Sequence, residues 1–333
     1  MSEATEGTGE APAETESPDH ARGEDSLLWT VIPKYGTYGL AVISMVLGLL
    51  AAPELASQGL QAYDDPSSGI NVLYFGGAVA AGTVGILLVQ RLGYGKTLFR
   101  MLFLGIFGYE AAILAWVFLP GGGVVAGVVG LGLFLALWFH SEWYVVDVAG
   151  VMLCAAIVAI FGISLVPGLV LAILVGMAVY DAYSVYVSGH MQSLVDGSLD
   201  LEIPMAFVLP RDPSFSLQSV DSIGDLADDE GEGGASLLGY GDAIIPGIMA
   251  VSAGNFLDAP ALVPWAPFLN APALGALIGG VLGTIGLHVL LSRLEGAQPA
   301  LIVLNPAVVI CYLLGALAGG VSLVTALGLD GVL

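Results

Sequence analysis

Two aspartates lie inside long apolar stretches of the sequence, and they are the residues best suited to chemistry. Asp242 follows Gly239-Tyr240-Gly241 about five residues inside one apolar run, and Asp181 follows Tyr180 near the end of another. An ionisable side chain at membrane depth costs roughly 2.5–3.5 kcal/mol on insertion scales, so such residues are usually paired, hydrated or functional. We therefore expect Asp181 and Asp242 to form one catalytic site.

A pair of neighbouring carboxyl groups can hydrolyse a peptide bond. Two carboxylates a few ångströms apart do not both ionise easily, so the pair shares a proton. One carboxyl then acts as a base toward water, and the other acts as an acid toward the carbonyl oxygen and the leaving amine. Gly239 and Gly241 leave room beside Asp242, and they allow the helix start to unwind next to a water-filled cavity.

The composition predicts that membrane-spanning helices position these acids. The chain has 333 residues, of which 57% are hydrophobic and 11% charged, whereas a soluble domain has about 25% charged residues. Apolar runs of 18 or more residues recur, which is typical of transmembrane helices. The predicted fold class is an all-α membrane protein with about nine transmembrane helices. The expected spans are approximately 35–53, 69–90, 99–119, 122–139, 144–162, 166–187, 237–257, 271–291 and 299–321.

The basic residues predict the orientation of the chain. All seven Lys and Arg residues lie on the side that holds the N-terminal tail and the loops after the even-numbered spans. Basic residues mark the cytoplasmic side, so we expect the N-terminus to be cytoplasmic and the C-terminus to be outside. Asp181 and Asp242 then lie at one depth, roughly 8–9 Å below the cytoplasmic face, on consecutive antiparallel helices.

The chain divides into four expected segments. Residues 1–26 form an acidic tail that we expect to be disordered. Residues 27–187 hold the first six spans, and residues 237–333 hold spans seven to nine. Residues 188–236 form a long acidic cytoplasmic loop, which we expect to be partly disordered, mainly around 221–234.

The net charge of −22 limits the partners and the host. The chain has 29 acidic and 7 basic residues, and such a surface repels nucleic acid, so no nucleic-acid partner is expected. Salt screening makes high acidity tolerable, which favours a halophilic host. Cys154 and Cys311 both lie in apolar runs, and the sequence predicts neither a metal site nor a cofactor.

Three sequence signatures together resemble those of the presenilin and signal peptide peptidase family. They are Tyr180-Asp181, Gly239-Tyr240-Gly241-Asp242 and Gln298-Pro299-Ala300-Leu301, in the sixth, seventh and ninth expected spans. Gly-x-Gly-Asp alone is a weak signal, whereas the set in this order is specific. The resemblance covers roughly residues 166–320. It implies a presenilin-like fold and an intramembrane aspartyl endopeptidase, an archaeal presenilin homologue in the cell membrane.

The resemblance also implies roles for particular residues. Asp181 and Asp242 would be the catalytic dyad, and the stretch 203–209 would be a strand that pairs with unwound substrate. The partners would be transmembrane segments of substrate proteins in the lipid bilayer, while oligomerisation and cleavage of the 188–236 loop stay open. The residues expected to position substrate are Tyr180, Gly239, Tyr240, Gly241, Gln298, Pro299, Ala300 and Leu301.

The subfamily signals point in two directions. Ile244-Ile245-Pro246-Gly247, after the Gly-x-Gly-Asp motif, resembles the signal peptide peptidases. The expected orientation, with the N-terminus inside, resembles presenilin. It favours single-pass substrates whose N-terminus is outside.

Other functions fit parts of the pattern. The same buried acids could serve a proton- or cation-coupled membrane transporter, although the internal repeats common in transporters are not seen. A prepilin-type peptidase also uses Gly-x-Gly-Asp, but it would lack the Pro-Ala-Leu element of span nine. A zinc protease is disfavoured, because His-Glu-x-x-His is absent from the sequence.

Three further titratable residues lie in the expected spans, and we expect structural roles for them. Glu110 is deep in the third span, where we expect a hydrogen bond to a neighbouring span. Asp147 lies near the cytoplasmic start of span five and is expected to be hydrated. His288 lies near the cytoplasmic end of span eight and is expected to be a hydrogen-bonded structural histidine.

Overall fold

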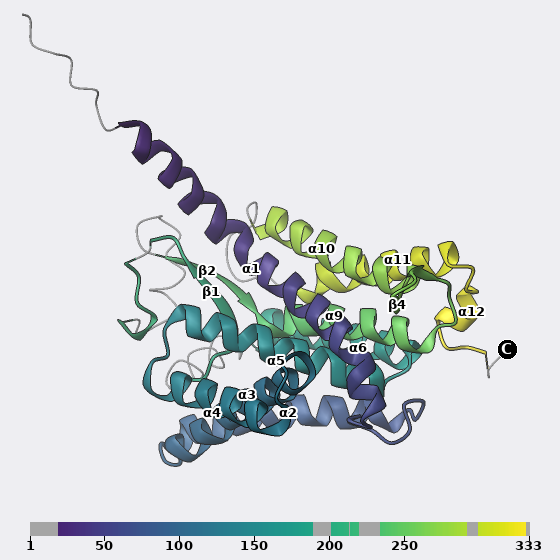
Figure 1. Ribbon diagram of the computed structural model, residues 1–333, viewed down its shortest axis with the longest axis horizontal. Coiled ribbons are helices and arrows are strands. Elements are labelled where there is room, and N and C mark those ends of the chain that lie inside the picture. The colour runs from purple at the N-terminus through teal and green to yellow at the C-terminus, as the bar shows by residue number, and fades with distance from the viewer. Residues whose placement is uncertain (1–18, 189–200, 213, 220–233, 292–298, 331–333) are drawn as a thin grey trace, which may run out of the picture.

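The computed structural model describes residues 19–188, 201–212, 214–219, 234–291 and 299–330. Within these ranges the chain is mostly helical, and the long helices lie side by side (Figure 1). The helices are α1 (Asp19–Ser57), α2 (Ile70–Leu92), α3 (Lys96–Phe118), α4 (Gly122–Phe139), α5 (Trp143–Ser164), α6 (Pro167–Tyr183), α9 (Tyr240–Phe256), α10 (Ala271–Leu291), α11 (Leu301–Ala318) and the short α12 (Leu323–Ala326). A π-helical turn (Ser184–Ser188) extends α6, and a 3-10 turn covers Leu217–Ser219.

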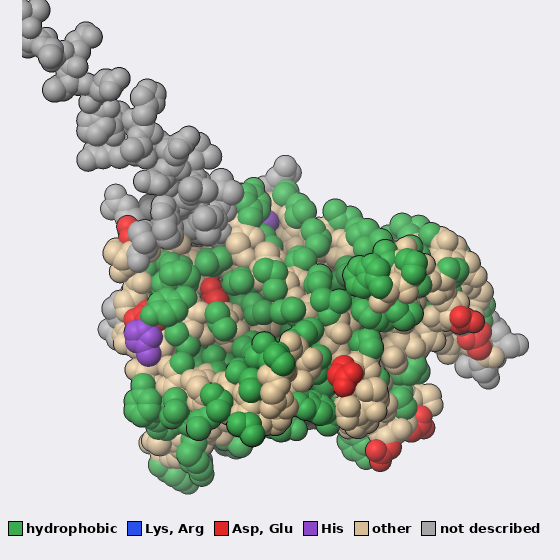
Figure 2. Space-filling view, viewed as in Figure 1, with side chains coloured by type: hydrophobic (Ala, Val, Ile, Leu, Met, Phe, Trp, Pro, Cys, Tyr) green, Lys and Arg blue, Asp and Glu red, His purple; other side chains and the backbone are tan. Residues whose placement is uncertain are grey.

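The expected fold class, an all-α membrane protein, is confirmed. The described residues contain eight helices that are long and apolar enough to cross a membrane, and they correspond to eight of the nine expected spans. The remaining helix, α9, has 17 residues, which is about 26 Å of helix against a hydrocarbon core of about 30 Å. Apolar side chains cover most of the face seen in Figure 2, which suits a surface in contact with lipid.

The start of the seventh span differs from the expectation. Helix α9 begins at Tyr240 rather than at residue 237, because residues Ala235–Gly239 form strand β2. Strand β2 pairs antiparallel with β1 (Ala206–Pro210), and Ala206 is opposite Gly239. A second hairpin, β3 (Ala261–Val263) and β4 (Ala266–Asn270), lies between α9 and α10. The two sheets lie at opposite ends of the bundle (Figure 1).

The two expected disordered segments fall largely outside the described residues. Helix α1 begins at Asp19, inside the segment 1–26 that was expected to be a disordered tail, and residues 1–18 are not described. The acidic stretch 221–234 lies outside the described residues except for Gly234. In the rest of the 188–236 loop, residues 201–212 and 214–219 have a defined structure.

Helix α5 is the centre of the bundle. Of the residues in its apolar stretch, 67% are buried, against 11% in α2. It packs against α1, α3, α9 and β1. Its buried positions are mostly small or β-branched, including Ala149, Ala155, Ala156 and Val158, which lets neighbouring helices approach closely.

Helices α10 and α11 pack through a row of glycines. Gly275, Gly279 and Gly283 are spaced four residues apart, so they lie on one face of α10. A Cβ at Gly279 would lie 2.6 Å from the Val308 Cα, and a Cβ at Gly283 would lie 2.9 Å from the Leu304 Cα. The backbones of the two helices therefore touch.

We expect Gly279→Ala to destabilise the protein, because the added methyl group would overlap the backbone of α11. Overpacking of this kind lowers the free energy of unfolding by about 1–3 kcal/mol. Unfolding of the purified protein in detergent measures the effect. Gly286→Ala is the control on the same helix, since its methyl would meet Val303 Cγ1 at an ordinary 3.4 Å. Equal stability of the two variants would contradict the close packing of α10 and α11.

Candidate functional site

Asp242 lies in the first turn of α9. It is the third residue of the helix, its side chain is half-buried, and Gly239 is the residue that precedes the helix. The N-terminus of a helix carries a partial positive charge, which stabilises a nearby carboxylate. Gly239 lies directly beside this carboxyl group, because a Cβ added to Gly239 would be 3.3 Å from the Asp242 Oδ2.

Asp181 lies near the end of α6 and is held by the start of α11. The Leu301 N–H donates a hydrogen bond of 2.9 Å to the Asp181 Oδ2. Leu301 is the first residue of α11, so its N–H has no acceptor within its own helix. Pro299, which is buried two residues earlier, has no N–H to satisfy. The Pro-Ala-Leu element thus supplies a backbone donor to Asp181.

The helices that correspond to expected spans six, seven and nine, namely α6, α9 and α11, lie against one another. The Asp181 and Asp242 carboxyl groups are close enough to interact electrostatically. The end of α6, the start of α9 and the start of α11 therefore converge on one pair of acids.

The remaining predicted positions differ in their surroundings. Gly241 is exposed, and a Cβ there would have open space around it. The Tyr180 hydroxyl lies 3.5 Å from the Thr83 Oγ1, so this tyrosine connects α6 to α2. Ala300 is half-buried beside Leu301. Gln298 lies outside the described residues.

Tyr240 is part of the core rather than of an open site. Its side chain is 5% exposed, and its hydroxyl donates a hydrogen bond of 3.0 Å to the Val146 carbonyl. The ring packs against Phe107 and Phe207. A Cβ at Gly150 would lie 2.6 Å from the Tyr240 hydroxyl oxygen, so this glycine leaves the space for the ring. Tyr240 therefore fixes the start of α9.

Asp147 corrects the sequence interpretation. It was expected to be hydrated, but it is 5% exposed, and its Oδ1 accepts a hydrogen bond of 2.7 Å from the Val208 N–H. Burial follows because β1 lies against the first turns of α5. The partner is a backbone group 61 residues away in the sequence, so no local pattern could reveal it.

The structural role expected from the sequence is found for His288 but not for Glu110. The expected hydrogen bond of Glu110 is not found, since its buried Oε2 has no hydrogen-bond partner within the described ranges. His288 has the structural surroundings expected of it. Its Nδ1 is 3.3 Å from the Tyr38 hydroxyl, and its ring contacts the rings of Tyr35 and Tyr38.

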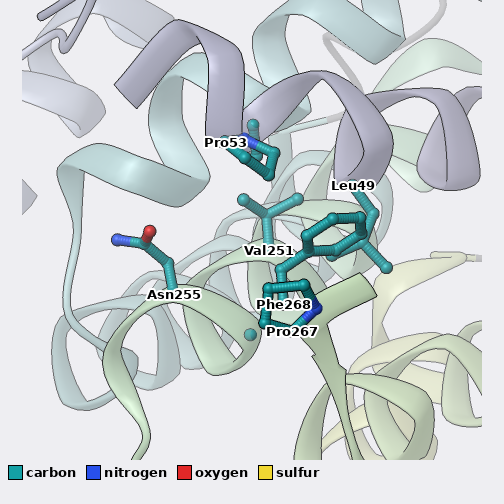
Figure 3. Close-up of a pocket in the computed structure, with 8 residues that line it drawn as sticks. Leu49, Pro53, Val251, Asn255, Pro267 and Phe268 are labelled. Carbon is teal, nitrogen blue, oxygen red and sulfur yellow. The ribbon is translucent and has the colours of Figure 1, made fainter. Parts of the chain in front are cut away.

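A pocket of about 240 Å³ lies between α1, α9 and β4 (Figure 3). Its lining is apolar apart from Asn255. Asn255 is 13 residues after Asp242, which is about 20 Å along a helix. This pocket is therefore not the site of the acid pair. Over the described part of the chain, no three His, Cys, Asp or Glu side chains group closely enough to hold a metal ion.

The sequence and the fold are similar to those of known proteins. Residues 38–321 match the family described as signal-peptide peptidase, presenilin aspartyl protease. The fold is similar to two crystal forms of a presenilin family intramembrane aspartate protease. The C222 form has a TM-score of 0.61 and 26% identity, covering 86% of this chain and 99% of that one. The P2 form has a TM-score of 0.57 and 27% identity, covering 85% and 97%. No curated protein matches the sequence.

The two glycines of the Gly-x-Gly-Asp motif are expected to respond differently to alanine. Gly239→Ala would place a methyl carbon 3.3 Å from the Asp242 Oδ2, so the carboxyl would have to move by a few tenths of an ångström, and misplacement of a catalytic group lowers the rate. We expect kcat for cleavage of a transmembrane peptide to fall, with KM little changed. Gly241→Ala adds its methyl in open space. Any effect is expected in KM, because a bound substrate would occupy that space. The reverse pattern would contradict this geometry.

Proposed function

The chain belongs to the signal-peptide peptidase and presenilin family of aspartyl proteases, and from this premise we propose that Asp181 and Asp242 are its catalytic dyad. The protein is a multi-pass membrane protein and an intramembrane aspartyl protease. The observation that carries the assignment is the convergence of α6, α9 and the start of α11 on this pair of acids.

The dyad activates water between the two acids. One carboxyl takes a proton from the water while the other gives a proton to the substrate carbonyl or the leaving amine. The shared proton belongs to the pair rather than to either residue. The Leu301 N–H fixes one oxygen of Asp181, which leaves the other oxygen of that carboxyl for the water. Gly239 keeps the space beside the Asp242 carboxyl free of side-chain atoms.

Strand β2 offers the backbone edge on which a substrate can unfold. The ladder with β1 continues beyond the strands, where the Tyr240 N–H donates to the Met205 carbonyl and the Arg211 N–H donates to the Gly234 carbonyl. Backbone groups alternate between the two sides of a strand, so every second residue of β2 faces away from β1. The residues facing away are Ala235, Leu237 and Gly239.

This edge leads directly to the dyad, because Gly239 is followed by the first turn of α9. Leu237 is 37% exposed and Gly239 is partly exposed. A substrate strand can add to β2 by β-augmentation, with backbone hydrogen bonds supplying affinity. The family resemblance implied this role for 203–209, but β1 is already paired with β2 on one side and bonded to Asp147 on the other. We therefore assign substrate pairing to β2.

The substrates are transmembrane segments of membrane proteins in the bilayer. We keep the orientation inferred from the basic residues, with the N-terminus cytoplasmic and the C-terminus outside, and hence substrates whose N-terminus is outside. The acidic composition supports a halophilic archaeal host and the cell membrane as the location. The transporter alternative has no support, since the family and the two crystal forms described above are proteases.

Replacing either acid is expected to abolish cleavage. Asp181→Asn and Asp242→Asn keep the side-chain shape and remove the ionisable group, so kcat should fall by at least about 10³-fold, as for other residues that act as one catalytic unit. Cleavage of a transmembrane peptide in detergent is the measurement, and unfolding in the same detergent checks the fold. Substantial activity in both variants would exclude this dyad.

Pairing with β2 predicts an alternating response to methylation of the substrate backbone. N-methylation at one substrate residue at a time removes one N–H donor, and only every second N–H of a paired strand points toward β2. We expect KM to rise at alternate positions on one side of the cleaved bond and to stay near the unmethylated value between them. An effect without alternation would argue against strand pairing.

A further inference from the structure

Asp147 lies on the side of β1 that is opposite to β2. The Val208 N–H, which donates to Asp147 Oδ1 at 2.7 Å, belongs to the set of β1 groups that do not face β2, since the ladder bonds at Met205 and Arg211 have the other parity. The carboxyl therefore occupies the outer edge of the sheet. The outer edge of β2 is not taken by Asp147, and it holds the exposed Leu237 and the partly exposed Gly239, whereas Ala235 is buried.

The same turns of α5 hold the junction between the sheet and α9. The Tyr240 hydroxyl bonds to the carbonyl of Val146, the residue before Asp147, and Gly150 makes space for the Tyr240 ring. Residues 146–150 thus contact β1 through Asp147 and the start of α9 through Tyr240. These contacts set the position of the sheet relative to the helices that carry the two acids.

The acceptor oxygen of Asp147 is the atom that matters for this contact. Its Oδ1 binds the Val208 N–H, whereas its buried Oδ2 has no hydrogen-bond partner among the residues that the structure describes. An amide oxygen can also accept a hydrogen bond from the Val208 N–H. Asparagine should therefore replace Asp147 in this role, and alanine should not.

We propose that Asp147 is a positioning residue that sets which peptide bond of the substrate is presented to the dyad. The proposal rests on the proposed function, since it requires substrate to pair with β2 beside Asp242. Anchoring of β1 to α5 fixes the position of the sheet relative to Asp181 and Asp242. The sheet in turn fixes the position of the paired substrate relative to these acids. Without the anchor the sheet can shift against Asp181, so the bond that meets the dyad is less well defined.

The experiment compares Asp147→Ala and Asp147→Asn in the full-length protein, with a transmembrane peptide as substrate and mass spectrometry of the products. For Asp147→Ala we expect kcat to fall at least about tenfold, since small misplacements are costly, with KM near the wild-type value. We also expect new products cut at neighbouring bonds. Asp147→Asn should keep the wild-type product pattern and a kcat close to that of the wild type.

Glu142→Ala is the matched control. Glu142 is also an acid at the start of α5, and it accepts hydrogen bonds from the Ser216 hydroxyl (2.6 Å) and the Leu217 N–H (3.0 Å), beyond β1 in the same loop. Its loss should loosen the loop without releasing β1, so the product pattern should stay that of the wild type. The same new products in Glu142→Ala and Asp147→Ala would overturn the proposal.

The other possible results also test the proposed role of Asp147. An unchanged product pattern in Asp147→Ala, or new products in Asp147→Asn, overturns the role of the acceptor oxygen. If Asp147→Ala does not fold in detergent, Asp147→Glu takes its place, because it keeps an acceptor but moves it by one methylene and should shift the products. Asp242→Asn is measured in parallel: cleavage retained there contradicts the proposed function, whereas an unchanged pattern in the Asp147 variants contradicts only this inference.

Discussion

A carboxyl group inside a membrane needs polar partners that lipid does not supply, and this constraint organises the structure around Asp181. The N-terminus of α11 meets the need with the Leu301 N–H, which would otherwise be an unsatisfied donor itself. One hydrogen bond thereby satisfies both the carboxyl of Asp181 and the free N–H at the start of α11. The close contact of α10 with α11 through Gly275, Gly279 and Gly283 then holds that helix start in place.

The second acid is positioned by a change of secondary structure. Strand β2 ends at Gly239 and α9 begins at Tyr240, so the chain turns from extended to helical just before Asp242. Tyr240 fixes this junction, with its ring buried against Phe107 and Phe207 and its hydroxyl bonded to α5. The central helix α5 therefore reaches the proposed catalytic region without contributing an acid of the proposed dyad.

The sequence predicts the helices well and draws attention to the two acids, because both depend on local patterns. Long apolar runs require helices, and Asp181 and Asp242 are conspicuous within them. The start of α9 was placed three residues too early, since the apolar pair Leu237-Leu238 suits a helix or a strand equally. The burial of Asp147 was missed because it depends on pairing between segments far apart in the chain, which composition does not encode.

The donor that holds Asp181 belongs to the main chain, and this affects how the site tolerates sequence drift. A side-chain partner would be lost by most substitutions, but every amino acid except proline carries the N–H found at Leu301. The bond to Asp181 therefore depends on where α11 begins and not on the Leu301 side chain. That side chain is buried, so it is left to serve packing beside the acid.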